Sequence, residues 1–577
     1  MDSLKEIGRQ ARPIRKYFVL AILFVGIETL FEVLIPLLMS DIIDQGILNK
    51  DMRIFATRGI GMIACAVLSL LTGMLYARYA AKASTKLGQL VRDKQFERIQ
   101  KFTFTNLDHF ETSGIITRLT SDVTVVQNAV TSGLRPLARG PVMLVLGLVM
   151  SFIINAKLAF VFFIVSPVLA LIMVWIVKKV APQYPLMQHA LDLINSVVQE
   201  NLTAIRTVKA FVRKKYEIEQ FDRINEQVAR ITQTTFHYAL FNTPAFQFCM
   251  YTTIVVLMLI GSNLILAGQL EVGQLTGILS YVLQILNSFV MLSNVFLLLT
   301  RSMASIGRIE QILAEPLQSA SPDPVREMKD PTIRFEHVSF KYAPDARKNV
   351  LSDICMTIDP GSSVGILGGT GSGKTTLVSL IPRLYDVSQG RLTIGNVKVE
   401  DYDLRFLRDK VAVVLQNNVL FSGTILDNLR WGDPDASLGE IEKACRIACV
   451  DEFMDRLSNG LETELGQGGV NVSGGQKQRL CIARALLKKP KILIFDDSTS
   501  AVDTKTDAKI REGLDTLTGM TKIIIAQRIQ SVEHCDQIIV LNDGMIEASG
   551  THAQLMRDSA VYREIYETQK RGGHDNG

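Results

Sequence analysis

The sequence predicts a two-part protein: an α-helical membrane domain with six spans, followed by an α/β domain that contains a P-loop. Of its 577 residues, 48% are hydrophobic and 21% are charged, and the mean hydropathy is +0.22. This composition is too apolar for an ordinary soluble enzyme and too charged for a bundle of membrane helices alone. Because the long apolar runs all precede residue 300, the two properties belong to separate regions.

Six apolar runs predict helices that cross a hydrocarbon layer of about 30 Å. The first run is too long for a cleavable signal peptide, so we expect it to remain as a span. The third run is entered through a basic stretch that contains Arg135 and Arg139. The six runs are residues 17–39, 54–76, 140–155, 158–177, 245–266 and 272–299.

Lysine and arginine residues are concentrated before the first run and in two long connections, residues 78–134 and 178–239. The positive-inside rule then places both termini and both connections on the cytoplasmic side of the cell membrane. The helical pattern of the connections indicates that the spans continue as helices below the membrane. We expect the turns between them near residues 103–110 and 213–221, where they could touch a soluble domain.

A change of composition after the sixth run predicts the domain boundary. Residues 1–313 form the expected membrane domain, residues 314–331 a linker with four prolines, and residues 332–577 the α/β domain. In the last region, short apolar segments alternate with helical ones, which predicts a largely parallel sheet. The expected strands are residues 364–367, 411–415, 492–495, 522–526 and 537–541.

The segment from Gly368 to Thr375 fits the P-loop pattern Gly-x4-Gly-Lys-[Ser/Thr], between an expected strand and a helix expected from Thr376. Its backbone N–H groups can surround phosphates, Lys374 supplies a positive charge, and Thr375 can ligate Mg²⁺. Asp496, at the end of another apolar strand, is the expected partner of Mg²⁺. The candidate phosphate-binding residues are Gly369, Thr370, Gly371, Ser372, Gly373, Lys374, Thr375 and Thr376.

A second glycine-rich turn, Ser473-Gly474-Gly475-Gln476, lies between these two phosphate motifs and opens a helix. Capping of that helix would explain Ser473. It would not explain the order of the four residues.

Six spans, long cytoplasmic connections and these three motifs together resemble an ABC exporter half-transporter of the multidrug type. The resemblance implies ATP and Mg²⁺ as cofactors and places Tyr342 against adenine. It implies that Gln416 reaches Mg²⁺ and that Asp503 belongs to a segment that communicates across a dimer. In this family two nucleotide-binding domains bind head to tail, so the turn at Ser473 would complete the ATP site of a second half-transporter.

Two residues depart from the pattern of an active exporter. Asp497 stands where a glutamate normally orients or deprotonates the attacking water, and Gln527 replaces the switch histidine. Aspartate is one methylene shorter than glutamate, and a misplacement of about 1 Å can slow catalysis about 10²-fold. Glutamine cannot carry the positive charge that is available to histidine. The chain therefore resembles the degenerate-site subunit of a heterodimeric bacterial exporter.

The expected function is ATP-driven export of amphipathic compounds, drugs or lipids, by alternating access. In this hypothesis the chain binds ATP at Lys374 but hydrolyses it poorly, and its Ser473 turn completes the partner's site. Two alternatives stay open: a slow homodimeric exporter of lipids or peptides, and a regulatory subunit that senses nucleotide.

Glu28 and Glu32 lie one helical turn apart in the first run, where charges are rare. They either attract a cationic amphipathic substrate or form ion pairs that fix helix packing. Basic stretches such as residues 213–215 fit a cytoplasmic face near anionic lipid, so no nucleic-acid partner is expected. Cys445 and Cys449 lack a second ligand pair nearby and are expected to be buried thiols.

Overall fold

The computed structural model describes residues 12–180, 182–318, 321–343, 345–457, 459–497 and 503–572. They form two units, which are described separately. The first contains Met1–Lys101 and Phe110–Pro316, and the second contains Phe102–His109 and Leu317–Gly577. The division after Pro316 lies within the segment where the sequence predicts a linker.

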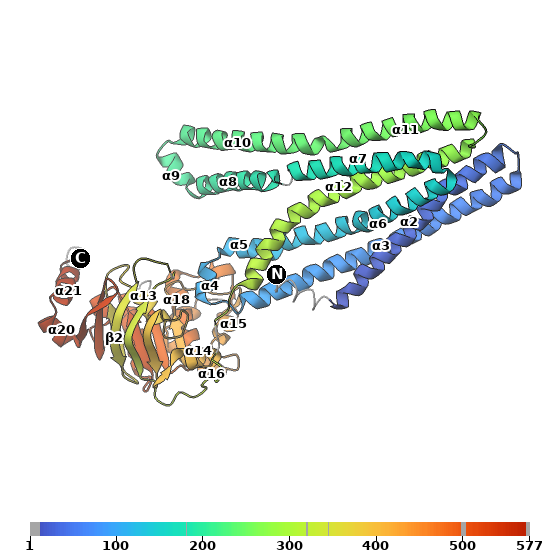
Figure 1. The fold of residues 1–577 in the computed structure, drawn as a ribbon. Helices are drawn as coiled ribbons and strands as arrows, with labels where there is room; N and C mark the ends of the chain where they lie inside the picture. Colours follow the sequence, from blue (N-terminus) through green and yellow to red (C-terminus); the bar gives the residue numbers. More distant parts are fainter. Residues whose placement is uncertain are drawn as a thin grey trace. The chain divides into compact units, whose positions relative to one another are not determined.

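The first unit consists of long helices (Figure 1). The long helices are α2 (Arg12–Asp41), α3 (Met52–Ile99), α6 (Val123–Ile154), α7 (Ala156–Val180), α8 (Gln183–Thr203), α10 (Lys214–Leu240), α11 (Asn242–Leu266) and α12 (Val272–Ala314). Short helical segments are the π-helices η1 (Ile42–Ile47) and η2 (Arg118–Asp122) and the helices α5 (Thr112–Thr117) and α9 (Ile205–Ala210). Six helical stretches among the described residues are long and apolar enough to cross a membrane, which confirms the six predicted spans.

Local hydrogen bonds explain where these helices begin and end. The Asp51 carboxylate caps α3 by accepting from the N–H groups of Arg53 (2.9 Å) and Ile54 (3.2 Å). Asn155 is extended and ends α6, and its Oδ1 accepts from the N–H of Leu158 (3.2 Å) in α7. These two helices therefore form the tight hairpin that their short connection requires.

The two long connections differ from each other at their turns. In the first, α3 continues to Ile99, and α4 (Phe104–Asp108) lies at the expected turn. In the second, the turn comes earlier than residues 213–221, so that prediction was wrong. Val212 adopts a left-handed backbone (φ 55°) just after α9, and α10 then runs through the expected turn without interruption.

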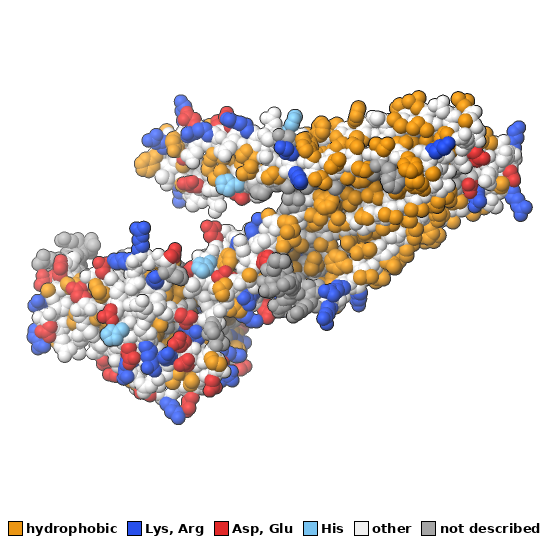
Figure 2. Space-filling model, viewed as in Figure 1, with side chains coloured by type: hydrophobic (Ala, Val, Ile, Leu, Met, Phe, Trp, Pro, Cys, Tyr) orange, Lys and Arg blue, Asp and Glu red, His pale blue; other side chains and the backbone are white. Residues whose placement is uncertain are grey.

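The surface of the first unit fits a lipid environment. On the face in Figure 2, hydrophobic side chains cover the middle of the long helices, and charged side chains gather near the helix ends. Ile60, Ile164 and Leu259 are among the apolar side chains that are exposed. Apolar contact in the middle and charge at the ends is the arrangement that a bilayer favours.

The second unit is built on a six-stranded sheet in the order β12-β11-β3-β10-β9-β6. Neighbouring strands are parallel, except that β12 pairs antiparallel with β11. Five of these strands match the predicted ones to within one residue at each end, and with the six spans they confirm the predicted fold class. Their bounds are β3 (Ser363–Leu367), β6 (Val411–Val414), β9 (Ile492–Asp496), β10 (Thr521–Ile525), β11 (Gln537–Asn542) and β12 (Met545–Gly550).

A second, antiparallel sheet in the order β2-β1-β4-β5 was not predicted. Its strands are β1 (Ile333–Phe340), β2 (Leu351–Ile358), β4 (Gln389–Ile394) and β5 (Val397–Lys398); β7 (Gly423–Thr424) and β8 (Glu464–Leu465) form a separate pair. The helices are α13 (Lys374–Ser379), α14 (Leu404–Lys410), α15 (Ile425–Arg430), α16 (Leu438–Ile447), α17 (Asp451–Met454), α18 (Gly474–Leu487), α19 (Thr504–Asp515), α20 (His552–Asp558) and α21 (Ala560–Gly572). Four 3₁₀ turns are η3 (Val399–Asp401), η4 (Gly460–Glu462), η5 (Gln467–Gly469) and η6 (Ile529–Ser531).

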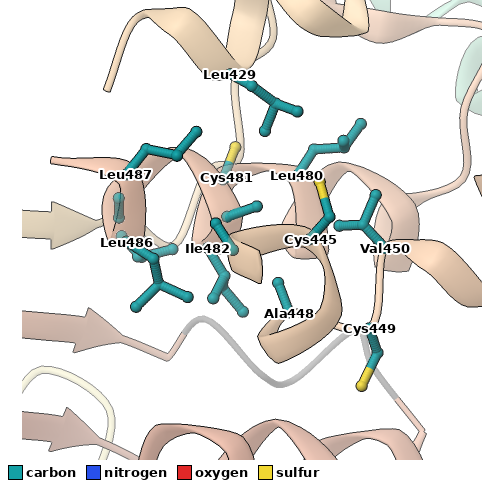
Figure 3. Close-up of a cluster of buried hydrophobic side chains, with 14 of the residues drawn as sticks. Leu429, Cys445, Ala448, Cys449, Val450, Leu480, Cys481, Ile482, Leu486 and Leu487 are labelled. Atoms are coloured by element: carbon teal, nitrogen blue, oxygen red, sulfur yellow. The ribbon is translucent and has the colours of Figure 1, made fainter. Parts of the chain in front are cut away.

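One apolar core of this unit lies between α16 and α18 and contains three cysteines (Figure 3). Cys445, Cys449 and Cys481 are free and buried, and burial raises the pKa of the Cys445 thiol to about 12. Figure 3 shows the sulfur of Cys449 directed away from that of Cys445. The arrangement agrees with buried thiols rather than a metal pair.

Candidate nucleotide-binding site

The P-loop follows β3, which lies between β10 and β11 in the parallel sheet. Gly371 (φ 82°) and Gly373 (φ 94°) have left-handed backbones that glycine adopts without strain. A Cβ at Gly368 would lie 2.2 Å from the carbonyl oxygen of Leu541, so this position has room only for glycine. α13 begins at Lys374, two residues earlier than expected.

Lys374 and Ser372 fit a phosphate group within this loop. Lys374 Nζ lies 2.8 Å from the carbonyl oxygens of both Gly368 and Gly369, and the hydroxyl of Ser372 is buried without a hydrogen-bond partner among the described residues. The space around Gly369 is open. Phosphate oxygens would supply the acceptors that the lysine and the serine hydroxyl need.

Thr375 and Asp496 form the expected Mg²⁺ site. Thr375 Oγ1 donates to Asp496 Oδ1 at 2.9 Å, from α13 and the end of β9 respectively. Hydroxyl and carboxylate oxygens are ligands that Mg²⁺ prefers. Burial raises the pKa of Asp496 and lowers that of Lys374. A divalent cation and a nucleotide phosphate would each restore a charge partner to these groups.

We expect Mg²⁺-dependent ATP binding to weaken as the pH falls toward the raised pKa of Asp496. Protons and Mg²⁺ compete for one carboxylate, so below that pKa the Mg²⁺ concentration for half-maximal binding should rise by up to about tenfold per pH unit. Titrating the full chain with ATP and Mg²⁺ at several pH values measures this. Asp496→Asn should remove the pH dependence, whereas Asp403→Asn, at the cap of α14, should keep it. Equal pH dependence in wild type and Asp496→Asn would contradict the assignment.

Tyr342 lies just after β1. Its hydroxyl is 2.8 Å from Thr376 Oγ1 in α13, and its ring meets those of Phe340 and Tyr385 edge to face. Tyr342 as a whole residue is 43% exposed. It therefore lies beside the P-loop with surface left for a base to stack on.

Gln416 lies in the loop after β6 and is exposed. Among the described residues, no hydrogen bond joins it to Thr375 or Asp496; its carbonyl oxygen accepts from Asn418 Nδ2. The structure therefore does not bring Gln416 into the Mg²⁺ site.

The two departures from the exporter pattern contact each other. Gln527 Nε2 donates to Asp497 Oδ2 at 2.8 Å. Asp497 has a left-handed backbone (φ 47°), which aspartate tolerates better than most residues. Helix α19 and strand β10 lie between these positions in the sequence, and the parallel pairing of β9 with β10 brings them together.

Gln569, in α21, was missed by sequence reasoning. Its Nε2 donates to the carbonyl oxygen of Gln527 (2.7 Å), and its Oε1 accepts from the N–H of Ile529 (2.9 Å). We name residues 526–529 the switch loop. The Gln569 side chain thus makes two hydrogen bonds to the backbone of this loop, one at Gln527 and one at Ile529. No sequence motif marks Gln569, so no signal in the sequence could have found it.

Ser473 and Gln476 cap α18 reciprocally. Ser473 Oγ accepts from the N–H of Gln476 (3.4 Å), and Gln476 Oε1 accepts from the N–H of Ser473 (2.8 Å). Gly474 and Gly475 form the first turn of that helix. Helix capping therefore accounts for both Ser473 and Gln476, and no hydrogen bond among the described residues joins this turn to the P-loop of the same chain.

Asp503 also caps a helix. Its carboxylate accepts from the N–H of Thr506 (3.0 Å) at the start of α19, which lowers the pKa of Asp503. Residues 498–502, which precede it, lie outside the described residues.

The turn of the first connection contributes a polar contact to the second unit. Tyr385 donates to Asp108 Oδ2 at 2.9 Å, and its ring meets that of Phe104. Burial, followed by the bond to Asp108, raises the pKa of Tyr385. The ring of Tyr385 also contacts that of Tyr342. Tyr385 therefore lies between this turn and Tyr342, the residue proposed to stack on adenine.

Glu28 and Glu32 are both paired with arginines of α6. Glu28 forms an ion pair with Arg135, and Glu32 with Arg139 at 2.6 Å. The Glu28 side chain is 4% exposed and that of Arg135 is 44% exposed. The ion-pair interpretation therefore describes both glutamates in this conformation.

Comparisons with known proteins agree with these observations. The family model described as "ABC transporter transmembrane region" matches residues 18–289, and the one described as "ABC transporter" matches residues 351–500. An uncharacterized ABC transporter ATP-binding protein, YfiB of Bacillus subtilis, is 38% identical and covers 95% of this chain and 96% of its own. An ATP-dependent lipid A-core flippase of Nitrosococcus oceani is 31% identical and covers 98% of this chain and 95% of its own.

The fold also matches a solved structure. A bacterial Atm1-family ABC exporter with ATP bound superposes with a TM-score of 0.83 at 23% identity, over 97% of this chain and 98% of the exporter chain. With the six spans, the P-loop and the Thr375–Asp496 pair in one chain, these similarities establish the family. The chain belongs to the ABC transporters: it joins one membrane domain to one nucleotide-binding domain and has the fold of an ABC exporter.

Proposed function

We propose that this chain is one subunit of a heterodimeric exporter in the cell membrane, with both termini on the cytoplasmic side. Its own P-loop binds ATP and hydrolyses it slowly, and its Ser473 turn completes the active site of the partner. The observation that carries this proposal is the hydrogen bond between Gln527 and Asp497 beside an intact P-loop.

The P-loop and the Thr375–Asp496 pair support ATP binding by this chain. Lys374 and the P-loop backbone would bind the phosphates, and Thr375 and Asp496 would hold Mg²⁺, which neutralises charge that develops on the phosphoryl group. Tyr342 would offer its ring to adenine. Gln416 would have to move toward Thr375 to reach the cation, and Asp503 would act near the dimer interface.

The residues needed for fast hydrolysis are altered. Asp497 has a short side chain, and its Oδ2 accepts from a neutral amide whose backbone is held by Gln569. A positioned general base contributes about 10²–10⁴-fold to the rate of such reactions. We infer that ATP stays bound at this site and helps to hold the two nucleotide-binding domains together while the partner site turns over.

The charges in the first unit favour an amphipathic substrate with an anionic head group. At the level of Glu28 the group with exposed surface is the guanidinium of Arg135, because the carboxylate is buried beneath it. Arg139, one helical turn away, is paired with Glu32, and these two side chains are equally exposed, at 22% each. A relative that is a lipid A-core flippase supports a lipid as the transported class. Glu28 and Glu32 would then set the position of the arginines rather than bind a cation.

Purification of the full chain, alone and with a second ABC half-transporter that co-purifies with it from its native membrane, tests the proposal. In lipid nanodiscs, the chain alone should hydrolyse ATP at least about 10²-fold more slowly than the pair. Hydrolysis at full rate by the chain alone, with transport into vesicles, would instead identify a homodimeric exporter. A pair that hydrolyses ATP without moving any amphipathic compound would identify a regulatory subunit.

A further inference from the structure

Three side chains with metal-binding atoms meet on β1 and β2, outside the nucleotide-binding site. His337 comes from β1, and Asp353 and Cys355 come from β2. His337 Nδ1 lies 2.7 Å from Asp353 Oδ1 and 3.5 Å from Cys355 Sγ. All three ligand atoms lie within 4.8 Å of one another.

Two β-bulges lie among these residues. The register of β1 against β2 shifts between Phe335 and Val338, and again between Val338 and Phe340. His337 lies in the first bulge, on β1, and Asp353 lies in the second, on β2; both have left-handed backbones (φ 51°). Bulges of this kind redirect side chains. Strict alternation already places Asp353 and Cys355 on one face of β2, and the first bulge brings His337 of β1 to the same face.

The three side chains are accessible to an ion from solvent. His337, Asp353 and Cys355 are all exposed. The other six cysteines of the chain are buried or half-buried. Cys355 is therefore the thiol that a metal ion in solution can reach most directly.

The geometry differs from that of a Cys-His-Asp catalytic relay. In a relay, the acid and the nucleophile bond to opposite nitrogens of the imidazole ring. Here the carboxylate and the sulfur both face Nδ1. The backbone N–H of His337 also donates to Cys355 Sγ at 3.3 Å, which stabilises negative charge on sulfur. Three potential ligand atoms thus face one point, and the sulfur also accepts a hydrogen bond. This arrangement is typical of residues that bind a metal ion.

We propose that His337, Asp353 and Cys355 bind one borderline-soft divalent ion of the Zn²⁺ class, with water at the fourth position. One nitrogen, one oxygen and one sulfur ligand are typical of zinc, whereas Mg²⁺ and Ca²⁺ prefer oxygen alone. The site is separate from the Mg²⁺ site at Thr375 and Asp496 and is independent of the proposed heterodimer. A bound ion would join β1 to β2 five residues before Tyr342.

Titration of the full chain with Co²⁺, in detergent and without an affinity tag, tests the proposal. The expected result is one ion per chain, with an absorption band for charge transfer from thiolate to Co²⁺. Cys355→Ser should abolish the band. His337→Asn and Asp353→Asn should weaken binding by at least about tenfold, as the loss of a ligand requires. Asparagine tolerates the left-handed backbone at both positions, so these variants should fold.

Cys65→Ser and His189→Asn are the matched controls, because they remove one thiol and one imidazole elsewhere, and both should retain the band. Added Zn²⁺ should also raise the melting temperature of the wild type and leave that of Cys355→Ser unchanged, since an ion that binds only the folded chain stabilises it. A wild type without the thiolate band would overturn the proposal. A band that persists in Cys355→Ser would do so as well.

Discussion

Replacing Asp497 with Glu and Gln527 with His together is expected to raise the ATP turnover of the full chain by about 10²-fold. Glutamate extends the carboxylate by one methylene toward the attacking water. Histidine at position 527 can carry a positive charge next to the γ-phosphate, which an amide cannot. The rate of phosphate release in nanodiscs, measured for the chain alone and for the chain with its partner subunit, gives the increase in ATP turnover.

Two further variants make this result specific. Asp497→Asn should give no gain, and addition of Lys374→Ala to the double variant should remove the gain, because the restored base then has no bound ATP. Position 497 has a left-handed backbone, in which glutamate is less favourable than aspartate by up to about 1–2 kcal/mol. A thermal melt checks that the double variant is folded. A folded double variant with unchanged turnover would refute the degenerate-site proposal.

Ser473→Ala is expected to reduce ATP hydrolysis by the paired complex by about 10²-fold, the loss typical when one preorganised donor to a transition state is removed. It should leave ATP binding at this chain's own P-loop unchanged, because Ser473 has no hydrogen bond to that loop in the structure. Lys374→Ala should do the opposite. It should abolish ATP binding at this chain's own P-loop and leave intact the Ser473 turn, which completes the partner's site. Photolabelling with an ATP analogue, together with phosphate release, separates the two effects.

Ser437→Ala is the matched control for this experiment. Ser437 caps α16 through the same reciprocal arrangement, with Glu440 in place of Gln476. Loss of either cap lowers the stability of the domain by about 1 kcal/mol. Ser437→Ala should therefore reproduce the change in stability without the change in hydrolysis. If both variants slow hydrolysis equally, Ser473 has only a capping role.

Motifs that are local in the sequence were predicted well. The strand before the P-loop and the strand that ends at Asp496 are short, apolar and bounded by glycine or charged residues, and β3 and β9 match them. The Thr375–Asp496 pair follows from these two strands, because parallel strands present their carboxyl ends at one edge.

Features that depend on contacts between distant segments could not be predicted. The bulges in β1 and β2 interrupt the alternation that marks a strand, so the antiparallel sheet was missed, and His337 with Cys355 was missed with it. The second turn was misplaced because Val212, a β-branched residue, adopts a left-handed backbone that its type does not favour. The sequence places Arg135 and Arg139 at the start of a predicted span. It does not show that they pair with Glu28 and Glu32, because those ion pairs depend on the packing of α6 against α2.

The link from α21 to the switch loop has a consequence for how the protein is made. During synthesis Gln569 is added after every strand of the parallel sheet, so its two hydrogen bonds to the switch loop can form only after all of those strands have been made. Synthesis of α21 therefore precedes the moment at which the switch loop reaches the geometry of the folded chain.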